Sequence, residues 1–269
     1  MTAVLLGAMP ATAEVTWRSL EPGLDLAAIK APVKSSHGDS TITVVRIDPR
    51  RFRFKLISAK ELKTGNRPAS GWAKRFGLLA AVNAGMFLQD HKTSVGFMRN
   101  GAHVNNPRMA REMNLVLAFN PRAAGLPPVR IIDLKLDDFG SLKGKYGTLI
   151  QSLRMIDGRG RNRWGVAQKK WSVVTIATTR AGKVLFVHAR SPYRMRVFGD
   201  MILKLPLDVR AMIYLEGGPE ATLYLNAGGV AFEKVGSYET GFRPDDTNKE
   251  AWALPNVVGV VRRGKAGAK

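Results

Sequence analysis

The chain of 269 residues is 45% hydrophobic and 23% charged, a composition typical of a globular protein that is long enough to bury its own core. The absence of cysteine excludes disulfides, thiolate metal sites and a cysteine nucleophile. Its 42 lysines and arginines against 21 acids give a net charge of +21, which favours anionic partners.

The first residues resemble a short export signal. Residues 3–13, AVLLGAMPATA, combine an apolar stretch with the small-x-small pattern Ala11-Thr12-Ala13, although a basic start is missing. We expect residues 1–13 to be the remnant of an export signal of a periplasmic or secreted bacterial protein; a first apolar strand is the alternative. The sequence contains no run of roughly 20 apolar residues that would predict a membrane-spanning helix.

Strands dominate the predicted secondary structure. Apolar runs rich in β-branched and aromatic residues indicate them, and a glycine-containing turn between residues 179 and 184 predicts the clearest hairpin. In chain order, the predicted strands are residues 41–48, 51–59, 78–83, 115–119, 129–134, 171–179, 184–189, 211–216, 221–225, 230–235 and 255–263.

Helices are few. Residues 67–77 predict a short helix with Ser70 as its N-cap and Gly77 as its stop, and residues 195–205 place their apolar side chains on one helical face. Neither a βαβ alternation nor a repeat is present. We therefore expect one α+β domain over residues 14–264, with a large mixed or mostly antiparallel sheet system, a few helices packed on it, and a flexible tail at 265–269.

Three strands, two of those above and a further one that ends at residue 156, stop at a polar residue beside glycine. They end in the sequences VNAGMF, RMIDGRG and YLEGGPE, which contain Asn83, Asp157 and Glu216. Glycine lets a ligand approach the backbone closely, and a strand end is a rigid platform for the side chain that it carries. We expect the three ends to share one cleft.

Asp157 and Glu216 are the natural acid pair for this cleft, because glycosidic bond cleavage commonly needs two carboxyl groups. Asp157 has a competing interpretation, since Asp-Gly is a favoured turn dipeptide. Glu216 follows a buried apolar run, where a carboxylate must be paired, hydrogen-bonded or catalytic. Glu220 is either a third acid or an exposed residue.

The sequence lacks the common motifs of histidine-based metal sites, serine hydrolases and nucleotide-binding sites. It contains no HExxH or His-x-His pair, no GxSxG elbow, no P-loop and no GxGxxG fingerprint, so we expect neither a metal nor a cofactor. Its aromatic residues do not alternate with basic ones, which disfavours nucleic acid as a partner.

The order of these motifs resembles the phosphodiester glycosidase family. Family members carry an Asn-Gly-Gly-Phe-like turn, a Gln-Ser…Asp-Gly segment and a Leu-Asp-Gly-Gly-x-Ser element. The matching positions are Asn83–Phe87, Gly96, Arg99–Gly101, Asn114, Gln151-Ser152, Asp157-Gly158, Lys170–Ser172 and Leu215–Glu220. This chain has Glu216 where Asp is commoner, Glu220 where Ser is commoner, and Ala84 in place of a glycine.

The resemblance implies hydrolysis of a sugar-1-phosphodiester on an exported or envelope glycan, an anionic substrate. It implies acid, base or nucleophile roles for Glu216 and Asp157, and a hydrogen bond from Asn83 to a sugar hydroxyl or phosphate oxygen. The implied substrate-binding residues are Gly85, Phe87, Arg108, Gln151, Arg154, Lys170, Ser172, Gly217, Gly218 and Glu220. Arg108, Arg154 and Lys170 are the candidates for phosphate contacts, with ordinary surface charge as the alternative for each. The competing interpretation is a non-catalytic protein that binds anionic envelope polysaccharide.

Overall fold

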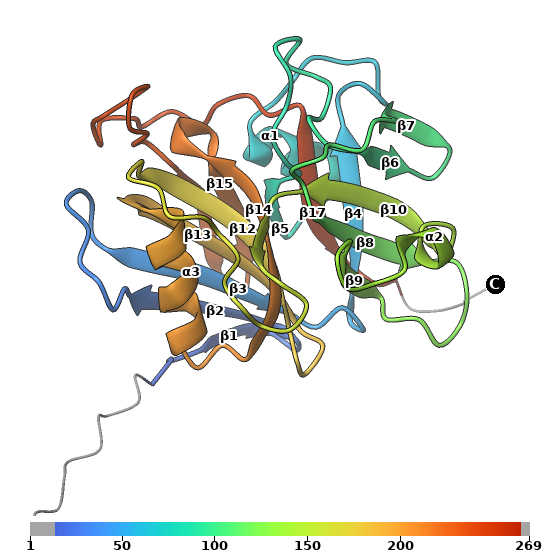
Figure 1. The fold of residues 1–269 in the computed structure, drawn as a ribbon, viewed down its shortest axis with the longest axis horizontal. Helices are drawn as coiled ribbons and strands as arrows, with labels where there is room; N and C mark the ends of the chain where they lie inside the picture. The colour runs from blue at the N-terminus through green and yellow to red at the C-terminus, as the bar shows by residue number, and fades with distance from the viewer. Residues whose placement is uncertain (1–13, 265–269) are drawn as a thin grey trace, which may run out of the picture.

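The computed structural model describes residues 14–264, so the predicted export signal and tail lie outside the described residues. Three antiparallel sheets make up most of this range (Figure 1). No helix between residues 14 and 264 is long and apolar enough to cross a membrane.

The largest sheet has seven strands in the order β1-β2-β3-β13-β12-β14-β11. Its strands are β1 (Arg18–Glu21), β2 (Leu24–Lys30), β3 (Thr41–Ile47), β13 (Val184–Tyr193), β12 (Trp171–Thr179), β14 (Val209–Gly217) and β11 (Arg154–Ile156). The hairpin predicted between β12 and β13 is confirmed, and β14 pairs with the other edge of β12.

Two five-stranded sheets complete the fold. One has the order β16-β15-β5-β17-β4, and the other β7-β6-β10-β8-β9. The strands of the first are β16 (Val230–Val235), β15 (Thr222–Ala227), β5 (Ala80–Asn83), β17 (Asn256–Arg262) and β4 (Phe52–Ser58); those of the second are β7 (His103–Asn106), β6 (Met98–Asn100), β10 (Tyr146–Ser152), β8 (Leu115–Pro121) and β9 (Val129–Asp133).

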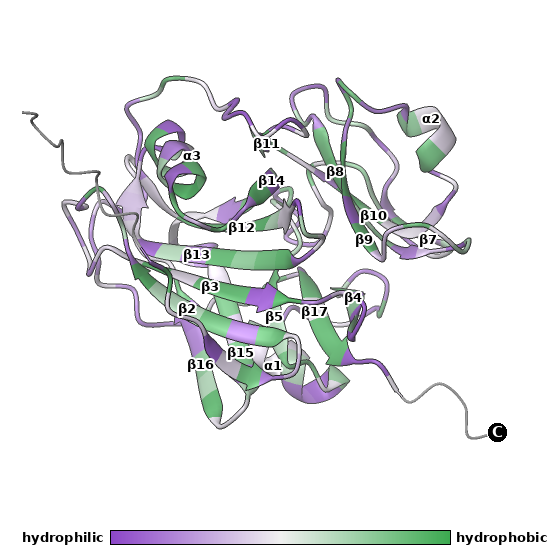
Figure 2. Cartoon of the chain, turned by 90° about the horizontal axis from the view of Figure 1, so that it is seen from below, coloured by the Kyte–Doolittle hydropathy of each residue, from purple (hydrophilic) through white to green (hydrophobic). Residues whose placement is uncertain are grey.

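The three sheets meet around one apolar core. The centroid of the Phe54 ring on β4 lies 6.1 Å from that of Phe119 on β8 and 6.0 Å from that of Phe186 on β13. One aromatic side chain of one sheet therefore packs against both of the other sheets. In Figure 2 the strands around this junction carry mostly hydrophobic residues. The predicted single α+β domain with a mostly antiparallel sheet system is confirmed.

The helices are peripheral. They are α1 (Ala69–Phe76), α2 (Phe139–Leu142), α3 (Met195–Lys204) and the 3₁₀ turn η1 (Gly218–Glu220). Helix α3 lies on the outer face of the seven-stranded sheet, where its buried side chains Phe198, Met201 and Ile202 join a second apolar cluster.

The predicted cap of α1 is half right. Gly77 ends the helix in the left-handed conformation, and its N–H donates to the Ala73 carbonyl. Ser70 as N-cap is wrong: Pro68 occupies that position without a capping side chain. The Ser70 N–H instead donates to Glu233 Oε1 at 3.0 Å, because β16 lies against the start of the helix.

Candidate active site

A β-bulge sets the direction of Glu216. Glu216 pairs with Val174 and Tyr214 pairs with Thr175, so Leu215 is an extra residue on β14. Cross-strand partners share a face, and Val174 faces the core between the sheets. The bulge therefore turns Glu216 away from the α3 side, where Tyr214 packs. Glu216 is buried, with 7% of its surface exposed.

Two glycines after Glu216 make room for neighbouring side chains. A Cβ on Gly217 would collide with the Tyr214 hydroxyl and lie 2.5 Å from the Trp171 ring. Gly218 has φ +63°, and a Cβ there would lie 2.5 Å from Glu239 Oε2. The turn is thus packed directly against an aromatic pair on one side and an acid on the other.

Glu216, Glu220 and Glu239 form an acid cluster at this turn. The charge of Glu239 raises the pKa of the other two, and the charge of Glu220 raises the pKa of Glu216. Within residues 14–264, none of the three forms an ion pair, although the chain carries a net charge of +21. The cluster is therefore either negatively charged without a paired cation, or at least partly protonated.

The pKa values of the three acids are raised to different extents, with burial as the largest cause for each. The pKa of Glu216 is raised well above its usual value, first by burial and then by the charge of Glu220; the Gly217 N–H, 3.1 Å from Oε1, opposes this. The pKa of Glu220 is raised by burial and by Glu239, and His91 opposes it. The pKa of Glu239 is raised by burial, opposed by Lys169. Glu216, the most buried of them, is the one best suited to hold a proton.

Asn83 joins a second strand end to the acid cluster. Its Nδ2 donates to the Glu220 carbonyl at 2.9 Å, and its Oδ1 accepts from the Thr222 N–H at 2.8 Å. Two of the three strand ends predicted to share a cleft therefore meet. Both ends of the Asn83 amide are therefore occupied by backbone groups of the turn.

Asp157 does not join them. Ile156 pairs with Met212, and β11 runs antiparallel to β14, so Asp157 lies toward the start of β14 while Glu216 lies at its end. The four-residue step from Met212 to Glu216 along the strand spans about 13 Å. The expected pairing of the Asp157 and Glu216 carboxyls is therefore wrong for this structure.

Asp157 instead organises its own turn. Its Oδ1 accepts from the backbone N–H groups of Arg159 and Arg161, and its Oδ2 pairs with Arg161 at 3.1 Å and Arg163 at 2.7 Å. These bonds overcome the effect of burial and lower the pKa of Asp157 to about 2. Asp157 is the turn residue that the Asp-Gly dipeptide indicates.

Two predicted substrate-binding residues are also occupied by the fold. The Gln151 amide makes four hydrogen bonds to the backbones of Phe97, Ala110 and Met113. The Ser172 hydroxyl donates to the Arg190 carbonyl and accepts from the N–H groups of residues 237 and 238. Gln151 therefore holds backbone between residues 97 and 113, and Ser172 holds the loop that leads to Glu239.

Phe87 and Lys170, two further predicted residues, have neighbours that lead to the acid cluster. Phe87, on the loop after Gly85, packs against His91 with ring centroids 5.6 Å apart, on the side where His91 acts on Glu220. The Lys170 backbone bonds to Thr240, next to Glu239. Arg108 is exposed.

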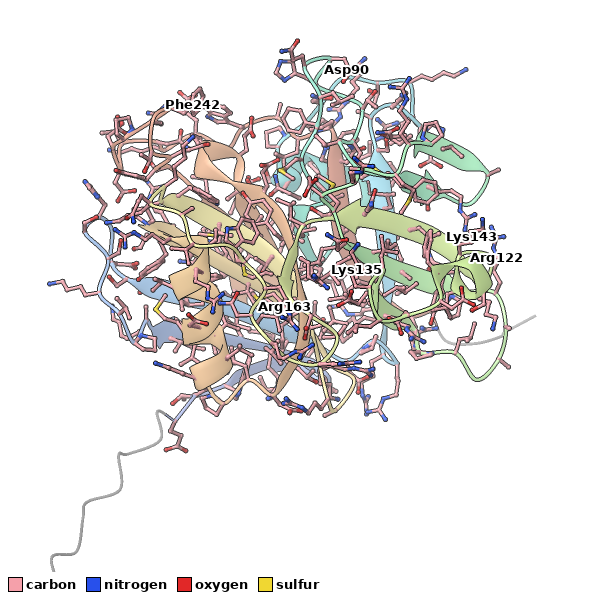
Figure 3. The ribbon with its side chains drawn as sticks, in the orientation of Figure 1. Asp90, Arg122, Lys135, Lys143, Arg163 and Phe242 are labelled. Atoms are coloured by element: carbon pink, nitrogen blue, oxygen red, sulfur yellow. The ribbon has the colours of Figure 1, made fainter. Side chains whose placement is uncertain are left out.

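Arg154 lines a cavity of about 280 Å³ together with Arg163 and Trp164. Arg154 pairs with the buried Asp133 at 3.2 Å, and Arg163, labelled in Figure 3, pairs with Asp157. The centroid of the Trp164 ring lies 5.2 Å from that of the Tyr214 ring, and the Tyr214 hydroxyl packs against Gly217. The Trp164 and Tyr214 rings therefore lie next to this cavity at one end and next to the turn of the acid cluster at the other.

Three residues of this region, Glu239, Tyr214 and Trp164, are absent from the sequence-based prediction. Glu239 sits in the loop after β16 with no motif around it, and only the fold brings it to Gly218. Tyr214 precedes Glu216 by two residues, which is a usable signal. In the part of the chain that the structure describes, no group of three or more histidines and acids has the arrangement of a metal site.

Comparison with known proteins agrees with this architecture. The catalytic domain of zebrafish N-acetylglucosamine-1-phosphodiester alpha-N-acetylglucosaminidase, auto-inhibited by its pro-peptide, is similar with a TM-score of 0.61 at 14% identity, over 93% of this chain and 88% of that one. A hypothetical protein from Synechocystis has a TM-score of 0.62 at 14% identity, over 93% of this chain and 64% of that one. A candidate exported protein from Burkholderia pseudomallei has a TM-score of 0.51 at 12% identity, over 82% and 74%.

At these low identities, the structural similarity shows a shared fold and nothing more. A search of curated proteins finds no match. The family model for phosphodiester glycosidases matches residues 76–261, more than half of the chain, and this range contains Asn83 and all three glutamates of the acid cluster. The chain therefore belongs to the phosphodiester glycosidase family.

Proposed function

We propose that the protein hydrolyses a sugar-1-phosphodiester, cleaving between the anomeric carbon and the phosphate oxygen, on an exported or envelope glycan. The observation that carries this proposal is the acid cluster: three glutamates without cationic partners in the described chain, gathered at a glycine turn. The family membership supports the reaction class, and the export-like pattern of residues 3–13 supports the location.

In this mechanism Glu216 is the general acid and Glu220 the general base. Glu220 takes a proton from water as the water oxygen attacks the anomeric carbon, and the bond between that carbon and the phosphate oxygen breaks. Glu216 donates its proton to the departing phosphate oxygen. A neutral Glu216 also removes a negative charge that would repel the phosphodiester. The products are a free sugar and a phosphomonoester.

The rest of the glycan lies in the cavity beside Trp164. Arg154 and Arg163 line it, and each guanidinium is held in place by a buried aspartate, so their positions are fixed before substrate binds. Arg108 and Lys170 contribute weaker positive charge from outside this cavity. Asp157 acts in this scheme by positioning Arg163.

Hydrolysis in H₂¹⁸O tests which bond breaks. The substrate is a methyl phosphodiester of N-acetylglucosamine 1-phosphate, and the products are identified by mass spectrometry. The proposal predicts free N-acetylglucosamine carrying ¹⁸O and unlabelled methyl phosphate. Release of N-acetylglucosamine 1-phosphate, with ¹⁸O in the phosphate, would assign phosphodiesterase chemistry instead.

The second candidate function is non-catalytic binding of an anionic envelope polysaccharide, which the net charge of +21 favours. It predicts salt-sensitive glycan binding without release of sugar. It also predicts that Glu216→Gln binds as tightly as the wild type.

A further inference from the structure

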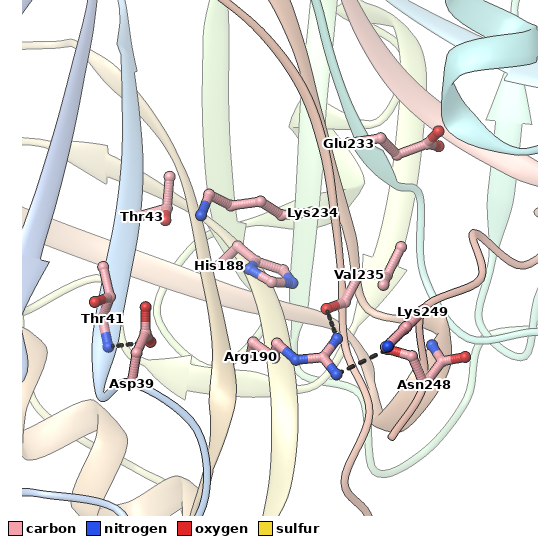
Figure 4. Close-up of a pocket in the computed structure, with 10 residues that line it drawn as sticks. All are labelled: Asp39, Thr41, Thr43, His188, Arg190, Glu233, Lys234, Val235, Asn248 and Lys249. Carbon is pink, nitrogen blue, oxygen red and sulfur yellow. Dashed lines mark hydrogen bonds between the residues drawn. The ribbon is translucent and has the colours of Figure 1, made fainter. Parts of the chain in front are cut away.

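A second cavity adjoins the chain segment that follows Glu220. Its volume is about 340 Å³, and its walls come from Asp39, β3, β13, β16 and residues 248–249 (Figure 4). None of the three glutamates of the cluster lines it. The two regions share a wall, because the His188 ring in this cavity bonds to the carbonyl of Ala221, the residue after Glu220.

His188 is 1% exposed and has one unused ring nitrogen. Its Nε2 lies 3.1 Å from the Ala221 carbonyl, which can only accept, so Nε2 carries the hydrogen. Burial lowers the pKa of His188 to about 3, which keeps the ring neutral at neutral pH. Nδ1 is then a hydrogen-bond acceptor, and it has no partner among the residues that the structure describes.

Thr43 and Lys234 place two further polar groups beside this ring. Thr43 is the cross-strand partner of His188, is 2% exposed, and makes no side-chain hydrogen bond within residues 14–264. Lys234 has no ion-pair partner in that range, and Figure 4 shows its ammonium group between Thr43 and His188. Arg190, on the opposite side of the ring, is occupied by an ion pair to Asp246 and three backbone carbonyls.

The exposed edge of the cavity adds charges of both signs. Asp39 and Glu233 bring carboxylates, and Glu233 is held by the Ser70 N–H. Hydrogen bonds from Thr41 and the charge of Lys234 lower the pKa of Asp39 despite its partial burial, so Asp39 is an ionised acceptor facing the cavity. Lys249 is exposed at the rim.

This set of free groups defines the chemistry of a ligand. Nδ1 of His188 needs an O–H donor, the Thr43 hydroxyl accepts or donates, and Lys234 needs an anionic oxygen. A volume near the lower end of the usual range for ligand sites, about 300–1,000 Å³, suits one sugar ring. We propose that this cavity binds a monosaccharide with one anionic group, separately from the acid cluster and independently of the proposed hydrolysis.

Isothermal titration calorimetry tests the site with four probes: glucose 6-phosphate, glucuronate, glucose and inorganic phosphate. The variants are Lys234→Gln and Thr43→Val, with the exposed Lys204→Gln as a control for the loss of one positive charge. Glu216→Gln separates this site from the acid cluster. The ¹⁵N chemical shift of His188 Nδ1 reports whether the probe reaches the ring.

The proposal predicts that glucose 6-phosphate or glucuronate binds and moves the Nδ1 resonance; which of them does so identifies the anionic group. Lys234→Gln is expected to weaken this binding at least tenfold and Thr43→Val at least threefold, while Lys204→Gln and Glu216→Gln leave it unchanged. Absence of binding by both acidic sugars at 10 mM overturns the proposal. So does equal affinity for glucose or inorganic phosphate, or equal affinity of Lys234→Gln and Lys204→Gln.

Discussion

Asn83 and Glu220 are 137 positions apart in the chain, and a 2.9 Å hydrogen bond joins the Asn83 amide to the Glu220 carbonyl. The same amide accepts from the Thr222 N–H. One side chain at the end of β5 therefore fixes the backbone on both sides of Ala221, and with it the position of the Glu220 carboxyl.

Replacing Asn83 by alanine is expected to destabilise the protein by about 2 kcal/mol, because it leaves the buried Thr222 N–H and Glu220 carbonyl without this partner. Hydrolysis should also fall, since Glu220 is no longer held. Urea unfolding measures the first effect. Asn226→Ala is the matched control: Asn226 is exposed on β15, and its loss should leave stability within about 0.5 kcal/mol. Equal effects of the two variants would refute this role of Asn83.

Gly217→Ala tests the packing of the turn. The added methyl group meets the Tyr214 hydroxyl and the Trp171 ring, so we expect a loss of about 1–3 kcal/mol in the free energy of unfolding. Gly65→Ala is the control, because no atom lies within 4 Å of the point that an added Cβ would occupy and its backbone is not left-handed. If both variants unfold at the same urea concentration as the wild type, the turn has room for a side chain at position 217, and the close packing against Tyr214 and Trp171 is contradicted.

Asp157 provides a test in acid. Its folded pKa of about 2 lies below the unfolded value, so its contribution to stability is complete above about pH 5 and is lost as the pH falls through 2. Asp157→Asn should lower the free energy of unfolding at pH 7 by about 2 kcal/mol, and the difference from wild type should shrink toward zero below about pH 2. Urea unfolding of both proteins across this pH range measures it, and a difference that does not change with pH would contradict the assignment.

The same variant, Asp157→Asn, also tests whether Asp157 takes part in catalysis. Because Asp157 lies far from the acid cluster, Asp157→Asn should retain kcat within about tenfold at temperatures where it is folded, with the main change in KM through Arg163. A loss of kcat as large as that of Glu216→Gln would restore Asp157 to the catalytic pair.

The pH–rate profile should have an alkaline limb set by Glu216. The acid form is the active one, so kcat falls as the pH rises through the raised pKa of this group. Glu239→Gln removes a neighbouring negative charge that helps to raise that pKa, and should move the limb to lower pH while activity at the optimum persists. A limb that stays in place in Glu239→Gln would assign it to another group.

The strands best predicted from the sequence are those with long apolar runs, such as β12, β13 and β14. Strands β1, β2, β6, β7 and β10 are missing from the prediction, because their sequences are short or polar and depend on sheet partners to satisfy their polar groups. In β10, the Thr148 hydroxyl donates to Asn100 Oδ1 at 2.9 Å, and Gln151 is saturated by two loops. Such pairing joins segments distant in the chain and leaves no local pattern.

The site is predictable from the sequence to the extent that it lies on one strand. The apolar run before Glu216 and the glycines after it are sufficient to identify the turn and the place of Glu220. The bulge at Leu215, which decides where Glu216 points, depends on pairing with β12. Asp157 resembles Glu216 as an acid at a glycine turn, but the antiparallel register of β11 against β14 separates the two.

The release of N-acetylglucosamine from its methyl phosphodiester, measured for wild type and Glu216→Gln, tests whether Glu216 is the general acid of this hydrolysis. We expect turnover by the wild type, a loss of roughly 10²–10⁴-fold in kcat for Glu216→Gln with its fold intact by circular dichroism, and no loss for the exposed Glu250→Gln. Full turnover by Glu216→Gln on a substrate that the wild type cleaves would contradict it.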